Sequence, residues 1–191
     1  MRAKKNGLKK YDAYIEHLEE KLAESYKHLG IINRQVSILL DLNKKRRTDS
    51  LELLKFITNS SVNLSKANIS LLFKYDSQKK MMDLLSITQA PGNKKKSIPA
   101  FCPDKHKFLA EFIRKKKLVQ GRFSPEDMEN GLAKTGCKYF ASFPLMTGKK
   151  LMGMLMLGFS HKECLSTQEL EFFEAFATQS SFVLEKMKAL K

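Results

Sequence analysis

The chain has 191 residues, with a net charge of +15, a hydrophobic fraction of 42% and a charged fraction of 29%. This length allows one domain of ordinary size with an appended helix, and it excludes two full domains. The longest apolar run, residues 151–159, is far shorter than the roughly 20 residues of a membrane helix. A charged N-terminus without a secretory signal, and three cysteines without CxxC spacing, predict a reducing, cytoplasmic location.

The basic excess includes three local runs, at residues 44–47, 94–96 and 114–117. Such runs are commonly solvated surface, and we favour that interpretation. Contact with phosphates or with an acidic lipid surface is the alternative. We do not predict a nucleic-acid partner, because the sequence contains no helix-turn-helix, zinc-finger or aromatic RNA-binding pattern.

Residues 8–43 follow a seven-residue apolar repeat, which predicts a long helix with a left-handed coiled-coil seam. Ser25 and Asn43 interrupt the seam. An exposed apolar stripe needs a partner, so we expect a homodimer; folding back onto the same chain is the alternative. The charges that flank the seam leave parallel and antiparallel pairing open. The expected interface residues are Leu8, Ile15, Leu18, Leu22, Leu29, Ile32, Val36 and Leu39.

Asp49 and Ser50 begin a second predicted helix, with the acidic Glu52 in its first turn. Period-two alternation then predicts strands at residues 67–75 and 81–89, joined as a hairpin. A long loop follows, with prolines at positions 91, 99 and 103. Loops of this length are usually functional or mobile.

The rest of the chain predicts helix, strand, helix, a second hairpin and a terminal helix. The expected ranges are 106–117, 118–123, 124–134, 138–146, 151–160 and 166–191. The strand at 151–160 is apolar on both faces, which predicts a central position. Gly153 and Gly158 in this strand predict close approach of another element or a ligand. Ser166 and Glu169 form an S-x-x-E capping box.

This order predicts an α+β protein with an antiparallel central sheet and helices on both faces, preceded by a long coiled-coil helix. We place the helix at residues 1–48 and the folded domain at residues 49–191.

Three segments carry a family resemblance: ANISLLF at 67–73, SFPL at 142–145 with MGMLMLG at 152–158, and LSTQELE at 165–171. In this order, the chain resembles the GAF domain family over residues 49–188. The resemblance implies an antiparallel sheet of about six strands, with the first and last helices on one face and a roofed pocket on the other. It also implies a signalling protein that binds small molecules and dimerises through its terminal helices.

The sequence lacks the NKFDE-type pattern of cyclic-nucleotide-binding members, the Cys-His pair of bilin-binding members and the cysteine arrangement of the methionine sulfoxide reductase members. The cofactor or ligand therefore stays unknown. Strand phase and the resemblance together place eight residues at the ligand pocket, although filled core is an equal alternative. These residues are Phe73, Phe101, Phe108, Phe112, Phe140, Ser142, Met154 and Met156.

The sequence gives little sign of an enzyme's active site, and we expect no catalytic residue. Cys102 with His106, and His161 with Cys164, could supply zinc ligands, but their spacing matches no standard site and we predict no metal. Cys102 beside Lys105 could be a reactive thiol, but nothing specific supports that role. Phosphate-binding glycine motifs are absent from the sequence.

The sequence therefore favours a regulatory module, either a small-molecule sensor or a dimerisation domain coupled to a coiled coil. Its expected partners are a second copy of the chain, an unidentified small molecule and another signalling protein. One alternative is a purely structural adaptor with a filled pocket. The other is an electrostatic binder of nucleic acid or anionic membrane.

Overall fold

A computed structural model describes residues 2–45, 49–91, 106–125, 136–161 and 165–189. Contacts divide the chain into two compact units, Met1–Ile38 and Leu39–Lys191. The predicted loop after residue 91 and the predicted helix at 124–134 lie almost wholly outside the described residues. The proposed domain boundary between residues 48 and 49 stays a prediction.

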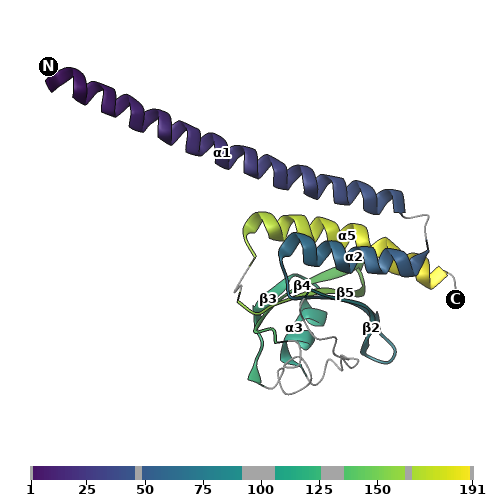
Figure 1. Cartoon of the computed structure of the whole chain (residues 1–191). Coiled ribbons are helices and arrows are strands. Elements are labelled where there is room, and N and C mark those ends of the chain that lie inside the picture. Colours follow the sequence, from purple (N-terminus) through teal and green to yellow (C-terminus); the bar gives the residue numbers. More distant parts are fainter. Residues whose placement is uncertain (1, 46–48, 92–105, 126–135, 162–164, 190–191) are drawn as a thin grey trace. The chain divides into compact units, whose positions relative to one another are not determined.

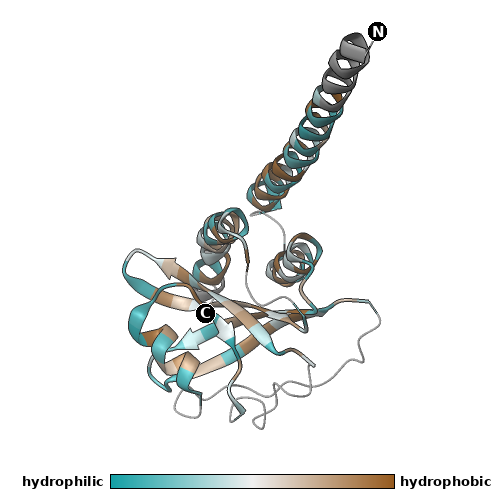
Figure 2. Ribbon diagram, turned by 90° about the vertical axis from the view of Figure 1, so that its left-hand side faces the viewer, coloured by the Kyte–Doolittle hydropathy of each residue, from teal (hydrophilic) through white to brown (hydrophobic). Residues whose placement is uncertain are grey.

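The long predicted helix is present as α1, Arg2–Lys44. Within the described side chains, apolar residues of α1 alternate with charged ones, and Figure 2 shows this as brown segments between teal ones. No proline interrupts the helix. Its last turns belong to the second unit, where Leu42 is buried. The helix is confirmed, while its pairing as a coiled coil stays a prediction.

The second unit contains a five-stranded antiparallel sheet in the order β2-β1-β5-β4-β3. Two hairpins supply four of the strands, as the alternation predicts, and a short edge strand completes the sheet. The strands are β1 Ile69–Asp76, β2 Met81–Gln89, β3 Val119–Arg122, β4 Tyr139–Thr147 and β5 Lys150–Phe159. β5 is the central strand, and Leu151–Phe159 are all buried, as predicted.

Helices cover both faces of this sheet (Figure 1, Figure 2). α2, Ser50–Ser65, and α5, Thr167–Ala189, lie on one face, and α3, Lys107–Lys115, lies on the other. The structure therefore confirms an α+β fold with an antiparallel sheet and helices on both faces. The described residues hold five strands, against the six or so that the family resemblance implied.

Local hydrogen bonds begin α2 and α5 where the sequence predicts. The Leu51 amide donates to the Asp49 carboxylate at 3.3 Å, which caps α2. At α5, the Ser166 amide donates to Glu169 Oε2 at 2.8 Å, and the Glu169 amide donates to Ser166 Oγ at 3.3 Å. This reciprocal pair is the predicted capping box, and it fixes where the chain enters α5.

A bulge between β4 and β5 changes which side chains face α3. The pairing of β4 with β5 shifts between Leu145 and Met146, so that Leu145 pairs with Gly153 and Met146 with Leu151. A bulge reverses the face on which later residues lie. Leu151 consequently joins Met154 and Met156 in one buried cluster, although simple alternation would place it on the other face.

Candidate ligand site and dimer seam

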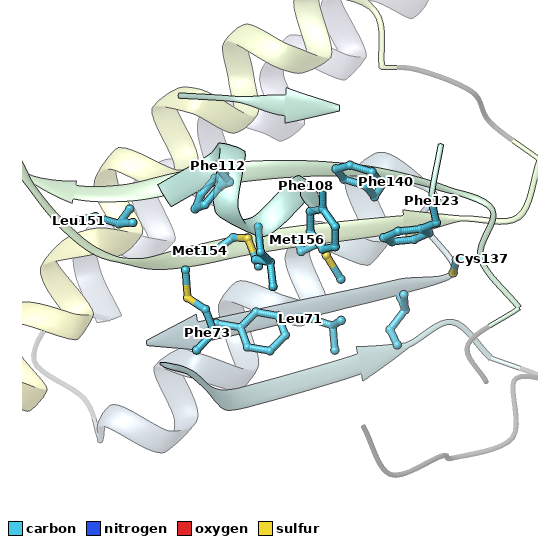
Figure 3. Packing of buried hydrophobic residues seen from close by; sticks show 13 residues of the cluster. Leu71, Phe73, Phe108, Phe112, Phe123, Cys137, Phe140, Leu151, Met154 and Met156 are labelled. Atoms are coloured by element: carbon cyan, nitrogen blue, oxygen red, sulfur yellow. The ribbon is translucent and has the colours of Figure 1, made fainter. Parts of the chain in front are cut away.

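Six of the eight residues predicted to line a pocket meet in one buried cluster between the sheet and α3 (Figure 3). Phe73 comes from β1, Phe140 from β4, and Met154 and Met156 from β5. Phe108 and Phe112 come from α3, whose apolar residues face the sheet. These six side chains are between 0% and 7% exposed. Phe101 lies outside the described residues.

Three aromatic rings form one end of this cluster. The Phe108 and Phe140 ring centroids are 4.7 Å apart, and Phe123 stacks on Phe140, also at 4.7 Å. Phe108 and Phe123 meet edge to face at 5.7 Å. Contacts in this range add stabilisation beyond the burial of apolar area. The rings thus join α3, β4 and the end of β3 into one apolar wall.

Ser142 is the polar residue among the predicted pocket residues. It lies opposite Met156 in the β4–β5 register and opposite Val119 in the β3–β4 register. By strand alternation it shares the α3-facing side with Phe140. Its side chain is 0% exposed, and its hydroxyl has no hydrogen-bond partner in the described part of the chain. Burying an unpaired hydroxyl costs free energy, so this group is a natural contact for a polar ligand atom.

A surface hollow of about 560 Å³ opens beside the aromatic group. Phe123 and Pro125 form its apolar part, and Arg122 and Lys138 supply two exposed cations. The hollow could therefore receive an apolar molecule with an anionic end, because both kinds of side chain border the same space.

Some cluster members were not among the predicted pocket residues. They are Ile69, Leu71, Met82, Leu109, Phe123, Cys137 and Leu151. Ile69 and Leu71 alternate with Phe73 along β1, so period-two spacing could have identified them. Phe123 follows β3, and no local pattern marks it as part of the aromatic group. Leu151 joins the cluster only because of the bulge between β4 and β5, which alternation alone does not predict.

The cysteines and histidines that were weighed as zinc ligands are only partly described. Cys102 and Cys164 lie outside the described residues. His106 is 3% exposed at the start of α3, with its ring 5.8 Å from that of Phe108. Within the described ranges, no group of three His, Cys, Asp or Glu side chains could hold a metal ion. The prediction of no metal therefore stays untested over the whole chain.

The predicted dimer seam is exposed along α1. Ile15, Leu18, Leu22, Leu29 and Val36 are between 47% and 56% exposed. Ile32 and Leu39 are half-buried, and the side chain of Leu8 lies outside the described ones. Regular spacing of exposed apolar side chains on one long helix is typical of a surface that pairs with another helix.

Two carboxylates of the second unit, Asp76 and Glu111, have pKa values below the ordinary ones. Backbone amides of Lys79 and Gln78 donate to Asp76 Oδ1 at 3.2 and 2.9 Å, and these bonds lower the pKa of Asp76. The Lys115 ammonium donates to Glu111 at 2.5 Å and lowers the pKa of Glu111. Hydrogen bonds and opposite charge both favour the ionised carboxylate. Both groups therefore remain negative under ordinary conditions.

The fold is thus an antiparallel sheet with two long helices on one face and a short helix over a buried aromatic cluster on the other. A match to the GAF domain family spans residues 48–185, and the chain therefore belongs to this family. GAF domains are known as signalling and sensor modules, so the general kind of protein is a regulatory one. Among the described residues, no helix is long and apolar enough to cross a membrane.

Solved structures share the fold at low sequence identity. The GAF domain of an Acinetobacter phosphoenolpyruvate-protein phosphotransferase is 13% identical, with a TM-score of 0.67, over 84% of this chain and 95% of that one. The corresponding Coxiella burnetii domain is 14% identical, with a TM-score of 0.66, over 84% and 96%. A phycocyanobilin-bound GAF domain from a cyanobacterial phytochrome is 16% identical, with a TM-score of 0.64, over 80% and 94%. No curated protein matches the sequence.

Proposed function

We propose that the chain is a non-catalytic, cytoplasmic regulatory module that forms a homodimer through α1 and senses a small molecule on the α3 side of its sheet. The observation that carries the proposal is the exposed apolar seam, with Leu22 and Leu29 more than half exposed on a helix of 43 residues. A helix with such a stripe is most simply completed by the same helix of a second copy.

The ligand part of the proposal rests on Ser142 and the aromatic group. The unpartnered hydroxyl of Ser142 can donate to or accept from one polar atom, while Phe108, Phe123 and Phe140 suit an apolar body. We therefore infer a mainly apolar ligand, with any negative charge directed toward Arg122 and Lys138.

Coupling between ligand and helices would pass through β5. This strand carries Met154 and Met156 in the cluster on one side, and on the other side Gly153 lies against Leu184 of α5. A ligand that moves the methionines would shift the packing of α5, and it would bias the dimer only if it binds the two arrangements with different affinity. Another signalling protein would then respond to the helices.

A second candidate is a structural adaptor whose ligand face is filled by its own side chains. The near-complete burial of the cluster favours it, because residues that fill a core need no ligand. In that case, the protein would act only by pairing through the seam of α1, and the Ser142 hydroxyl would be buried without a ligand partner.

Native mass spectrometry of the purified protein, followed by denaturation of the same sample, separates these candidates. A dimer with additional small-molecule mass that leaves on denaturation supports the sensor. A dimer without additional mass, and without thermal stabilisation by apolar carboxylates, favours the adaptor. A monomer at micromolar concentration contradicts the dimer that both candidates need.

A further inference from the structure

A group of exposed lysines gathers at the end of the sheet where β1 ends and β5 begins. We call it the basic end, and it comprises Lys79, Lys80, Lys116, Lys117, Lys149 and Lys150, all exposed. The register places the β1–β2 and β4–β5 turns together, because Asp76 pairs with Met81, Thr147 pairs with Lys150 and Lys74 pairs with Gly153.

A hydrogen bond attaches the end of α3 to the same place. Lys116 adopts a left-handed conformation with φ of 50°, and its amide donates to the Phe112 carbonyl at 2.8 Å, which ends α3. Its ammonium group donates to the Lys149 carbonyl at 3.2 Å. Lys116 thereby joins two basic segments that are 33 residues apart in the chain.

Nearby carboxylates neutralise the basic end only in part. Asp76 is held by the amides of its own turn, and Glu111 is paired with Lys115. Glu174 of α5 borders a hollow of about 500 Å³ together with Lys116 and Lys117. Asp76 keeps its negative charge, so Asp76 and Glu174 together oppose six lysines, and a local excess of positive charge remains, which attracts anionic surfaces.

The shape of the basic end suits contact with a broad anionic surface better than binding of a nucleic-acid strand in a groove. Its charges come from two turns and one helix end, so they project from the edge of the fold. A hollow of about 270 Å³ between the turns is lined in part by Ser77, Gln78 and Lys150. Tyr75 also lines it but is half-buried, and residues 74–80, 114–118 and 146–152 present no exposed aromatic ring. Single-stranded nucleic acids usually bind through such rings.

We propose that the basic end docks the protein onto an anionic phospholipid bilayer. Recognition of a bilayer requires a cluster of lysines near one surface and no base-specific contact, and each lysine strengthens the attraction about fivefold. Clusters of 4–8 basic residues on membrane-proximal segments and amphipathic helices bind such membranes, and the six lysines of the basic end match that number. Docking would bring the module to a membrane without a membrane-spanning helix.

Vesicle co-sedimentation of the full chain tests this proposal. The vesicles are neutral phosphatidylcholine, alone or mixed with phosphatidylserine, in low and in moderate salt. The test variant is K117E/K149E, and K117Q/K149Q removes the same charges without reversal. The matched control is K27E/R34E, which changes the net charge by the same amount as K117E/K149E. Its two residues occupy outward-facing heptad positions of α1. Circular dichroism checks that every variant is folded.

We expect the wild type to bind phosphatidylserine vesicles in low salt, to ignore neutral vesicles and to dissociate as salt rises. K117Q/K149Q should bind about 25-fold more weakly and K117E/K149E weaker still, while K27E/R34E should lose less than about threefold. Absence of binding in low salt overturns the proposal, as does an equal loss in the control. Lysine-dependent binding to a DNA duplex, without vesicle binding, would also overturn it and assign the surface to nucleic acid.

Discussion

Gly153 of β5 and Leu184 of α5 lie in direct contact where the terminal helix packs on the sheet. A Cβ placed on Gly153 would lie 2.7 Å from Leu184 Cδ1 and would also collide with the Phe73 carbonyl oxygen of β1. The sequence predicted a close approach at this glycine, and the approaching elements are a neighbouring strand and the terminal helix. The missing side chain therefore allows the sheet and α5 to pack closely.

Gly153→Ala should destabilise the second unit by about 1–3 kcal/mol, because its methyl group must displace a strand carbonyl as well as Leu184. Urea unfolding measures this change. Gly121→Ala in β3 is the matched control, since the nearest side-chain atom is 4.0 Å from the added Cβ. Equal stability of the two variants would contradict the packing described at Gly153.

Leu22→Asp combined with Leu29→Asp should convert the proposed homodimer to a monomer, because each helix would place two charges in the seam. Analytical ultracentrifugation at several protein concentrations measures the change in mass. Ala23→Asp introduces one charge at an exposed position beside the seam and should leave the dimer intact. Monomeric wild-type protein, or a dimer that survives the double substitution, would count against α1 as the interface.

Ser142→Ala should raise the stability of the ligand-free protein by about 1 kcal/mol, since it removes a buried hydroxyl without a partner. Ser70→Ala is the matched control: Ser70 is also 0% exposed and unpartnered in the described chain, but strand alternation places it on the face covered by α2 and α5. Thermal melts test both variants.

The same pair of variants tests the ligand site. Once a small molecule is identified by mass spectrometry, Ser142→Ala should weaken its binding about tenfold, the loss expected for one buried hydrogen bond. Ser70→Ala should bind it as the wild type does. Isothermal titration calorimetry that finds equal affinity in all three proteins would remove Ser142 from the site.

Asp76 should make stability depend on pH in the acidic range. Amide hydrogen bonds from Lys79 and Gln78 lower the pKa of Asp76 below its ordinary 3.8, so the folded state favours the ionised form. Its contribution is fully present above the ordinary pKa and is lost as pH falls through the lower folded value. Thermal melts between neutral and acidic pH should show a smaller acid loss in Asp76→Asn than in the wild type. If stability falls equally with pH in Asp76→Asn and in the wild type, the hydrogen bonds of Asp76 in the turn are not the cause.

Several local features were predictable from the sequence because they depend on residues close together in the chain. The hairpin strand at Met81–Gln89 matches its predicted range, and Ser166 and Glu169 form the expected capping box. The apolar character of both faces of residues 151–160 placed that strand at the centre of the sheet. Six of the eight proposed pocket residues share one cluster, Ser142 lies in register beside it, and Phe101 lies outside the described residues.

The sequence alone determined the order of the described elements, the long apolar seam and the family resemblance, because periodicity and capping act over a few residues. Only the tertiary structure decided that β1 pairs with β5 and that the Asn68 side chain accepts from the Ser160 amide, 92 residues away, at 2.7 Å. It also decided that a bulge turns Leu151 into the cluster and that Phe123 stacks on Phe140. Such contacts join distant segments, and their geometry depends on how the whole sheet and its helices pack, which no local pattern encodes.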